Sequence, residues 1–433
     1  MTTRHSISYT PHERAKVING LTRLLDSPEF ELHRHMAAEV FWGGLVEDLS
    51  AEQADWLERS QQAEVNFVSW MLYDLPDGDG VGPTVAEVLS IRERARMTRG
   101  ERAYLDRAIA SHVRLYEVEG VDRGVGFMLK DLWTGETVRV RERAATESIV
   151  PWDLMAARVI EDGDGAWVID GSIFTYPPRG KSEFLRALRA LHRTFRKKFP
   201  GADEAVFFKG IGMLFNEWWL DWTVFPPLPT VVTAEGDEMM LTTVRFDVRD
   251  AAKLLAALDN APEFERNRDR SYRWIENLTD GGVRSLGTIT IDGCRLVLET
   301  TSKPRGRRGR KAIEQAARDA VSYRSVGSQT MAEALAGRAR TEQPLSSGLP
   351  PAEEARLMKT FLDDHYRKWL DKPIPALSHR TPRHAVTLKT VRSKVIDLLK
   401  EMENGQSRVA QRGEQVYDVG WLWRELGLER PHE

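Results

Sequence analysis

Residues able to perform acid–base or metal chemistry are present in the sequence, but they are scattered. Ten histidines and a single cysteine, Cys294, are distributed along the chain. His33 and His35 stand two residues apart, whereas two ligands on one helix face stand three or four apart. No P-loop, GxSxG, HExxH or dinucleotide-binding glycine pattern is found. We therefore assign no catalytic residue, metal site or cofactor. We favour a binding protein over an enzyme, although carboxylates distant in sequence could still form an acid–base pair.

Two groups of basic residues could instead bind the phosphates of a nucleic acid. The first recurs at helical spacing on a predicted amphipathic helix, residues 182–199, and the second is the run at residues 303–311, which contains two glycines. The residues concerned are Arg186, Arg189, Arg193 and Arg196 in the helix, and Lys303, Arg305, Arg307, Arg308, Arg310 and Lys311 in the run. The competing interpretation is a solvated helix face and a basic turn before a helix. The net charge of −3 shows that the whole chain is not a polycation, so any affinity for nucleic acid would have to come from these local groups.

The sequence near the C-terminus predicts two helices joined by a proline-containing loop. The first helix begins at Pro351 and ends before Lys372-Pro373-Ile374-Pro375, because proline disfavours helical geometry in the residue before it. Thr381-Pro382 begins the second helix, since threonine is a good N-cap and proline fits the first helical position. Asn404-Gly405 is expected to end it.

Four short stretches of this segment together form a recognisable pattern: Trp369-Leu370, the stretch from Asp371 to Leu377, Arg380-Thr381-Pro382 and the aliphatic run at residues 395–399. Through these residues the segment resembles the toxin-binding domain of the Xre/MbcA/ParS antitoxin family. In that family the module docks on a partner toxin and neutralises it, often a RES-type enzyme acting on NAD. Ser378 and His379 stand where the family usually has glycines, so we expect a loop of different shape. The helix-turn-helix domain that often precedes the module is not evident.

The resemblance implies a set of partner-binding residues. They are Trp369, Leu370, Pro373, Pro375, Leu377, Arg380, Thr381 and Pro382. Trp369 and Leu377 are expected to be apolar anchors, while the prolines fix the loop. Arg380 could offer a charged fork to a partner carboxylate. We also expect the chain to fold without residues 351–433.

Residues 98–310 resemble the middle region of bacterial proteins that carry a SEC-C zinc motif. This likeness is carried by Leu115-Tyr116-Glu117-Val118, by Leu132-Trp133-Thr134-Gly135-Glu136 and by residues 296–302. The cysteines of the SEC-C zinc site itself are missing, so the likeness implies common ancestry more than a shared activity.

The helices and strands that the sequence predicts around the candidate binding residues indicate an α+β fold. Paired capping residues in the first part of the chain indicate helices, and they are Thr10 with Glu13, Ser50 with Gln53 and Thr84 with Glu87. Short alternating segments between residues 112 and 174 indicate a small antiparallel barrel. We divide the chain into a helical region at residues 1–110, a small β-barrel at 111–178, an α+β domain at 179–325, a linker at 326–350, a helical module at 351–404 and an apolar tail at 405–433.

Composition is that of a globular protein, with 41% hydrophobic and 29% charged residues in 433. One cysteine suits a reducing compartment, and no signal peptide or membrane span is apparent, so we expect a cytoplasmic protein. We favour a non-enzymatic protein-binding protein, antitoxin-like or an adaptor, whose partner is another protein. The alternative is an RNA-binding protein that uses the barrel and the basic segments at residues 186–198 and 303–311. The sequence leaves the partner's identity and the oligomeric state open.

Overall fold

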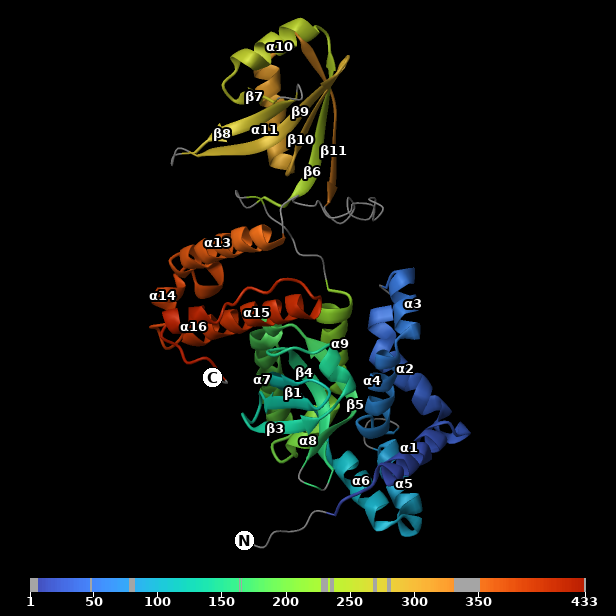
Figure 1. Ribbon diagram of the computed structural model, residues 1–433. Coiled ribbons are helices and arrows are strands. Elements are labelled where there is room, and N and C mark those ends of the chain that lie inside the picture. Colours follow the sequence, from blue (N-terminus) through green and yellow to red (C-terminus); the bar gives the residue numbers. More distant parts are fainter. Residues whose placement is uncertain are drawn as a thin grey trace. The chain divides into compact units, whose positions relative to one another are not determined.

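A computed structural model shows an α+β protein whose chain forms two compact units. The first unit contains Met1–Pro227 and Gly348–Glu433, and the second contains Leu228–Ser347. The structure describes residues 7–46, 49–77, 82–162, 164, 166–226, 233, 237–267, 271–278, 282–330 and 351–431. Figure 1 labels the elements of both units.

Six helices form the N-terminal region. They are α1 Pro11–Leu25, α2 Glu31–Val46, α3 Ala51–Arg59, α4 Gln61–Tyr73, α5 Val85–Glu93 and α6 Arg99–Ala110. All three predicted capping pairs are confirmed, because Thr10, Ser50 and Thr84 each accept a hydrogen bond from the third helical amide and receive one back at their own amide. Thr98 and Glu101 form a fourth capping box that begins α6.

The predicted barrel is confirmed. Its strands are β1 Val113–Asp122, β2 Gly126–Asp131, β3 Thr137–Arg141, β4 Leu154–Glu161 and β5 Trp167–Tyr176. They close in the order β1-β2-β3-β5-β4. All pairs are antiparallel except β3 with β5, which are joined by a short parallel contact. Buried side chains such as Val118, Phe127 and Met155 form one core cluster of the barrel.

Three further helices belong to the first unit rather than to the α+β domain that we predicted from residue 179. They are α7 Lys181–Lys198, α8 Glu204–Gly210 and α9 Gly212–Trp219. Phe184 and Leu188 of α7 and Trp219 of α9 share one core with α4 and with strands of the barrel. Trp218, Trp219 and Trp222 therefore pack within this core, and the boundary between the units falls near residue 228.

The second unit is an α+β layer structure. Its elements are β6 Met240–Val248, α10 Ala251–Asn260, β7 Phe264–Arg266, β8 Tyr272–Asn277, β9 Val283–Asp292, β10 Arg295–Thr300, α11 Lys303–Ala316 and β11 Val321–Thr330. The sheet has the order β11-β6-β10-β9-β8-β7 and is antiparallel throughout, and α10 and α11 share one core with it. Strands β9 and β10 form a hairpin that turns at Asp292-Gly293. Strand β11 runs into the predicted linker, of which residues 331–350 lie outside the described residues.

The C-terminal segment contains α13 Pro351–Leu370, a 3-10 turn Pro375–Leu377, the short α14 Pro382–Ala385, α15 Arg392–Gln411 and α16 Trp421–Glu425. Thr381 caps α14 as predicted, since the His384 amide donates to its hydroxyl at 3.2 Å. The single helix expected from Thr381 onwards is wrong, because α14 ends at Ala385 and residues 386–391 form turns before α15 begins. The expected helix end at Asn404-Gly405 is wrong, because α15 continues through both residues. We call residues 351–431 the C-terminal module from here on.

The two glycines of the basic run do not give it flexibility. Gly306 and Gly309 lie in α11 and are buried against the sheet. A Cβ atom at Gly309 would stand 2.4 Å from Leu298 Cδ2 and 3.0 Å from the Trp274 ring. Both neighbours are buried in the core of the second unit, so neither has free space to move into. These glycines allow α11 to approach the sheet closely.

We expect Gly309→Ala to lower the free energy of unfolding of the second unit by about 1–3 kcal/mol, because the added methyl overpacks the core. Gly405→Ala is the matched control, since Gly405 is also inside a helix but meets nothing within 4 Å. This control should raise stability by up to about 1 kcal/mol through helix propensity. Denaturant unfolding followed by circular dichroism measures both. A Gly309→Ala protein as stable as Gly405→Ala would contradict the packing argument.

Candidate docking surface in the C-terminal module

Three of the predicted partner-binding residues belong to the interior of the module. Leu370 and Leu377 have 0% of their surface exposed, and Pro382 is also buried. Both leucines share a core cluster with Leu399 of α15 and Trp423 of α16. The prediction that Leu377 is a docking anchor is therefore wrong for this conformation, because a side chain without exposed area cannot contact a partner.

The other predicted residues lie in or beside the loop between α13 and α14. Trp369 is half-buried and packs against the module core, and Arg380 and Thr381 are also half-buried. Pro373 and Pro375 are exposed. The loop is closed by a bridge in which the Ile374 amide donates to the Arg380 carbonyl at 3.0 Å.

Ser378 and His379 adopt left-handed backbone conformations, with φ values of 56° and 59°. Non-glycine residues rarely occupy this region, whereas glycine does so readily. We expected a loop of different shape because these residues replace glycines. The loop instead has a backbone that glycine favours, at the cost of strain in two residues.

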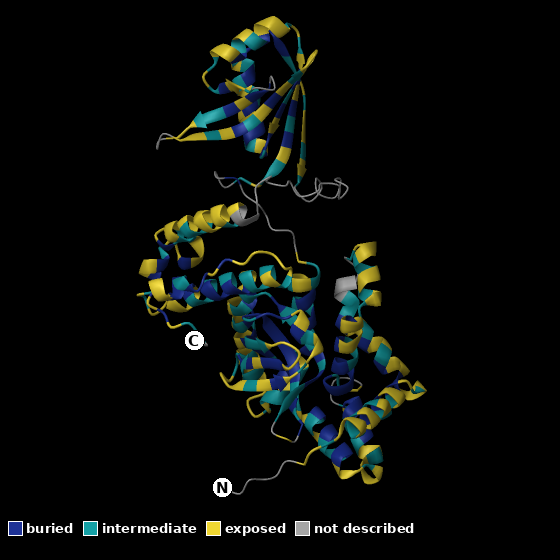
Figure 2. Ribbon diagram, in the orientation of Figure 1, coloured by how far each residue is buried: buried dark blue, intermediate teal, exposed yellow. Residues whose placement is uncertain are grey.

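The residues that sequence reasoning missed form an exposed apolar face near the start of α13. Leu357, Met358 and Phe361 are 55%, 51% and 64% exposed. Figure 2 shows most of α13 in the colour of exposed residues. We name Leu357, Met358 and Phe361 the α13 face. The signal was present in the sequence, since Leu357 and Phe361 share a helix face, but spacing alone does not tell a buried face from an exposed one.

A hollow beside this face and a second hollow, which no α13 residue lines, share the chain segment at residues 416–418. One, of about 320 Å³, is lined by Met358 and Leu362 of α13 and by Val416, Tyr417 and Trp421. The other, of about 520 Å³, lies between α15, the barrel loop at residues 151–152 and the segment 416–419.

The floor of the smaller hollow is fixed by hydrogen bonds. The Tyr417 hydroxyl donates to Asp363 Oδ1 at 2.6 Å, and the Trp421 ring nitrogen donates to the same hydroxyl at 3.0 Å. Tyr417 also stacks on Tyr366 of α13. Burial and the hydrogen bond to Asp363 raise the pKa of Tyr417 to about 12, so the tyrosine stays neutral at physiological pH. These contacts hold the segment 415–421 against α13.

The C-terminal module is joined to the barrel by buried polar contacts. Lys400 of α15 donates to Glu117 of β1 at 2.6 Å, and Lys181 donates to the other oxygen of that carboxylate at 2.8 Å. Burial alone would raise the pKa of Glu117, but the two lysine charges outweigh burial and lower it. Trp152 donates from its ring nitrogen to Glu403 at 2.8 Å. We call this set of contacts the α15 seam.

A second part of the α15 seam is centred on Asp153. Asn404 and Arg408 of α15 donate to Asp153 Oδ1 at 2.8 Å and 2.7 Å. Removing residues 351–433 would uncover Trp152 and leave Glu117 and Asp153 without these partners. The seam therefore argues against our expectation that the chain folds without residues 351–433.

The basic run of α11 does not form one phosphate-binding surface as predicted. Arg305 is buried, and its guanidinium donates to the Thr301 hydroxyl at 2.8 Å. Arg308 pairs with Glu276, and Arg310 pairs with Glu314 and covers the ring of Tyr323. In the described part of the chain, Lys303, Arg307 and Lys311 are exposed and have no acidic partner. The run is thus mainly a packing element of the second unit.

The basic stripe of α7 is exposed in the structure. Arg186, Arg189 and Arg193 have no acidic partner among the residues that the structure describes. Arg196 differs from them, because its guanidinium donates to His192 Nε2 and to the Ala202 carbonyl. Three of the four arginines of this helix therefore remain available to an anionic partner.

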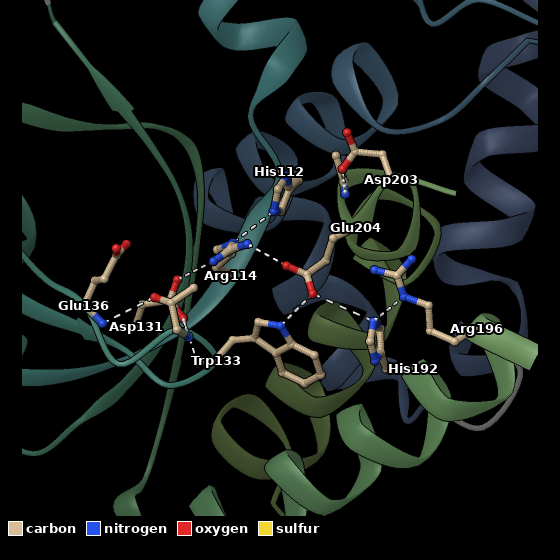
Figure 3. Close-up of polar contacts among 11 residues, drawn as sticks. His112, Arg114, Asp131, Trp133, Glu136, His192, Arg196, Asp203 and Glu204 are labelled. Atoms are coloured by element: carbon tan, nitrogen blue, oxygen red, sulfur yellow. Dashed lines mark hydrogen bonds and ion pairs between the residues drawn. The ribbon is translucent and has the colours of Figure 1, made fainter. Parts of the chain in front are cut away.

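A polar cluster between the barrel and helices α7 and α8 uses part of the SEC-C-like sequence (Figure 3). Arg114 of β1 donates to Asp131 at 2.8 Å and to Glu204 at 3.3 Å. The Trp133 ring nitrogen donates to the other Glu204 oxygen at 2.8 Å. The charges in this cluster pair with one another, so we interpret it as a link between the barrel turn and α8 rather than as a reaction centre.

His112 completes this cluster. It stacks in parallel on Phe208 of α8 and accepts a hydrogen bond from Arg114 Nε at 2.9 Å. Burial, assisted by the charge of Arg114, lowers the pKa of His112 to about 4. The ring is therefore neutral in the folded protein at physiological pH.

Comparisons with known proteins add no relative. No protein-family model matches the chain, and no curated protein matches it. Among the residues that the structure describes, no group of three or more histidine, cysteine, aspartate or glutamate side chains is placed to hold a metal ion. None of the helices within the described ranges has both the length and the apolar character needed to cross a membrane.

We expect Ser378→Gly and His379→Gly each to raise the free energy of unfolding by about 0.5–1 kcal/mol. Glycine relieves left-handed strain of about 1–2 kcal/mol, less the extra entropy of the unfolded chain. Thermal unfolding measures the change. Ser378→Ala is the control and should give no gain, because alanine retains the Cβ atom that causes the strain. Equal stability of the glycine and alanine variants would contradict this assignment.

The depressed pKa of His112 predicts a loss of stability as the pH falls. The unfolded chain takes up the proton near the ordinary pKa of 6.5, whereas the folded protein does so only near 4. The contribution of His112 is therefore fully present above about pH 6.5 and is lost between about pH 6.5 and pH 4, amounting to about 3 kcal/mol. Urea unfolding across this range should show a steeper decline for the wild type than for His112→Gln. Parallel pH profiles of the two proteins would refute the prediction.

Proposed function

We propose that this protein is a non-enzymatic docking protein that binds another protein through its C-terminal module, in the manner of an antitoxin or adaptor. The observation that carries the proposal is the α13 face. Three large apolar side chains, each more than half exposed, lie together on one helix beside a hollow. Exposed apolar groups of this kind mark interaction sites more often than single exposed residues do. The proposed docking residues are therefore Leu357, Met358 and Phe361.

The geometry of the loop supports the resemblance to the antitoxin module. The family usually has glycines where Ser378 and His379 stand, and both residues adopt a conformation that glycine favours. The buried Leu370, Leu377 and Pro382 act in this proposal by shaping the module, not by touching the partner. The charges near the α13 face are of both signs, with Lys359 paired to Asp363. We infer a cytoplasmic partner protein with an apolar centre and a polar rim, the composition of a reversible interface.

Nucleic-acid binding is the second candidate, and the stripe of Arg186, Arg189 and Arg193 favours it. These arginines recur along one side of α7, and exposed guanidinium groups suit phosphate oxygens. The second unit supports it less, because the exposed sheet positions carry residues such as Arg245, Thr288 and Glu299 rather than aromatic rings for base stacking. Three phosphate contacts to a single strand predict a shallow salt dependence, with a slope of about −2 in log affinity against log salt.

Site-specific photocrosslinking tests the docking proposal. A benzophenone amino acid in place of Phe361 should give one heavier product containing a different polypeptide, identified by mass spectrometry. The same group in place of Val206, another exposed apolar residue, is the matched control and should give none. Leu357→Asp should reduce the product from position 361 at least tenfold, because it places a charge in the apolar contact.

Nuclease treatment separates the two candidate functions. The product from position 361 should survive nuclease, since the contact is between proteins. No product from position 361, equal products from positions 361 and 206, a product containing only a second copy of this chain, or a product lost with nuclease would overturn the proposal. Circular dichroism of Leu357→Asp should match the wild type, because residue 357 is exposed.

A further inference from the structure

The segment that links α15 to α16 has the features of an unpaired strand edge. Residues 414–419 adopt neither helix nor strand. Exposure alternates over residues 416–419, since Val416 and Asp418 are exposed while Tyr417 and Val419 are buried. Alternation with a period of two is the pattern of an extended chain with one face against the protein.

The main chain of this segment has one side free of hydrogen bonds. The Tyr417 amide donates to Gln406 Oε1 of α15 at 2.8 Å. In an extended chain the amides of neighbouring residues point to opposite sides, so those of Val416 and Asp418 point away from Gln406. Within the described structure, the amide and carbonyl groups of Val416 and Asp418 have no hydrogen-bond partner. We call these groups the open edge.

The surroundings of the open edge suit the side chains of an added strand. Residues 416–418 line two hollows, and the smaller one is also lined by α13. The smaller hollow offers apolar contacts from Met358, Leu362 and Trp421. In strand addition, main-chain hydrogen bonds give affinity while alternate side chains enter pockets and give specificity.

Charge at the open edge favours a basic side chain in the ligand. Asp418 is exposed, and its Oδ1 atom accepts a hydrogen bond from the Gly420 amide at 2.8 Å. Its second oxygen, which has no hydrogen-bond partner among the described residues, can accept a hydrogen bond from a lysine or arginine.

We propose that the open edge binds an extended segment of the partner protein, which pairs with Val416 and Asp418 and places an apolar side chain in the smaller hollow and a basic one beside Asp418. This inference rests on the proposed docking function and specifies its mode. The occupant is an extended peptide rather than a helix, because the unsatisfied groups belong to the main chain of an extended segment.

Val416→Pro tests the open edge, because proline removes the amide hydrogen of residue 416 without removing a hydrogen bond of the folded protein. Val416→Ala is the matched control, since it shortens the side chain and retains the amide. The probe is a displayed library of random twelve-residue peptides selected on the full-length wild-type protein. Selected peptides should alternate apolar and basic residues with polar ones. They should bind Val416→Pro at least tenfold more weakly than Val416→Ala in fluorescence polarisation.

Hydrogen exchange gives a second measurement on the wild type. A bound peptide should slow exchange of the amides of Val416 and Asp418 at least tenfold. Failure to select any peptide, equal binding to the proline and alanine variants, or unchanged exchange at both amides would overturn the inference. If Val416→Pro lowers the melting temperature, the exchange measurement decides alone. A crosslink from position 361 together with any of these negative results would leave the docking function standing and remove only the extended mode.

Discussion

The carboxylate of Glu117 is the constraint on which the first unit depends. It is buried on β1 and takes one lysine from α7's first turn and one from α15, two residues that are far apart in the chain. A buried carboxylate that lost both lysines would be costly, whereas the paired group gives little net stability compared with an apolar core. The contribution of this ion-paired carboxylate is therefore to specify the arrangement of the elements that it joins. The three charges fix where α15 lies on the barrel, and thereby where the C-terminal module presents α13.

Trp152 reinforces the same arrangement. It holds a left-handed backbone with φ of 72°, which is unusual for a bulky residue, and its ring lies under the Lys400 ammonium at 4.2 Å. The ring nitrogen donates to Glu403 of α15 at 2.8 Å. Strain of this kind persists where surrounding contacts determine the conformation. The barrel loop and α15 therefore define each other's position, and neither has this structure without the other.

Local chemistry in the sequence was sufficient to predict most elements. Capping pairs such as Thr10 with Glu13 act over three residues, and strand alternation acts over ten, so both were predicted correctly. Burial in three dimensions was harder to foresee. Leu377 and Phe361 are both apolar and near each other in sequence, yet Leu377 is buried and Phe361 is exposed. Arg305 likewise could not be distinguished by sequence from the other basic residues of its run, yet it is buried in the structure. These outcomes depend on contacts between segments that are distant in the chain, such as Leu377 with α15 and α16 or α11 with its sheet, which no local pattern encodes.

The second unit interrupts the first between α9 and α13, and its sheet begins and ends side by side, since Met240 of β6 pairs with Thr330 of β11. A domain whose two ends adjoin can be inserted into a loop of its host without separating the flanking segments. The insertion has a consequence for synthesis on the ribosome. The barrel leaves the exit tunnel well before α15 has been translated, and the intervening domain can mature in that interval. Nascent chains thus carry an uncovered surface around Trp152 for the time needed to make more than a hundred further residues. During this time chaperones could bind that surface, which α15 covers in the finished protein.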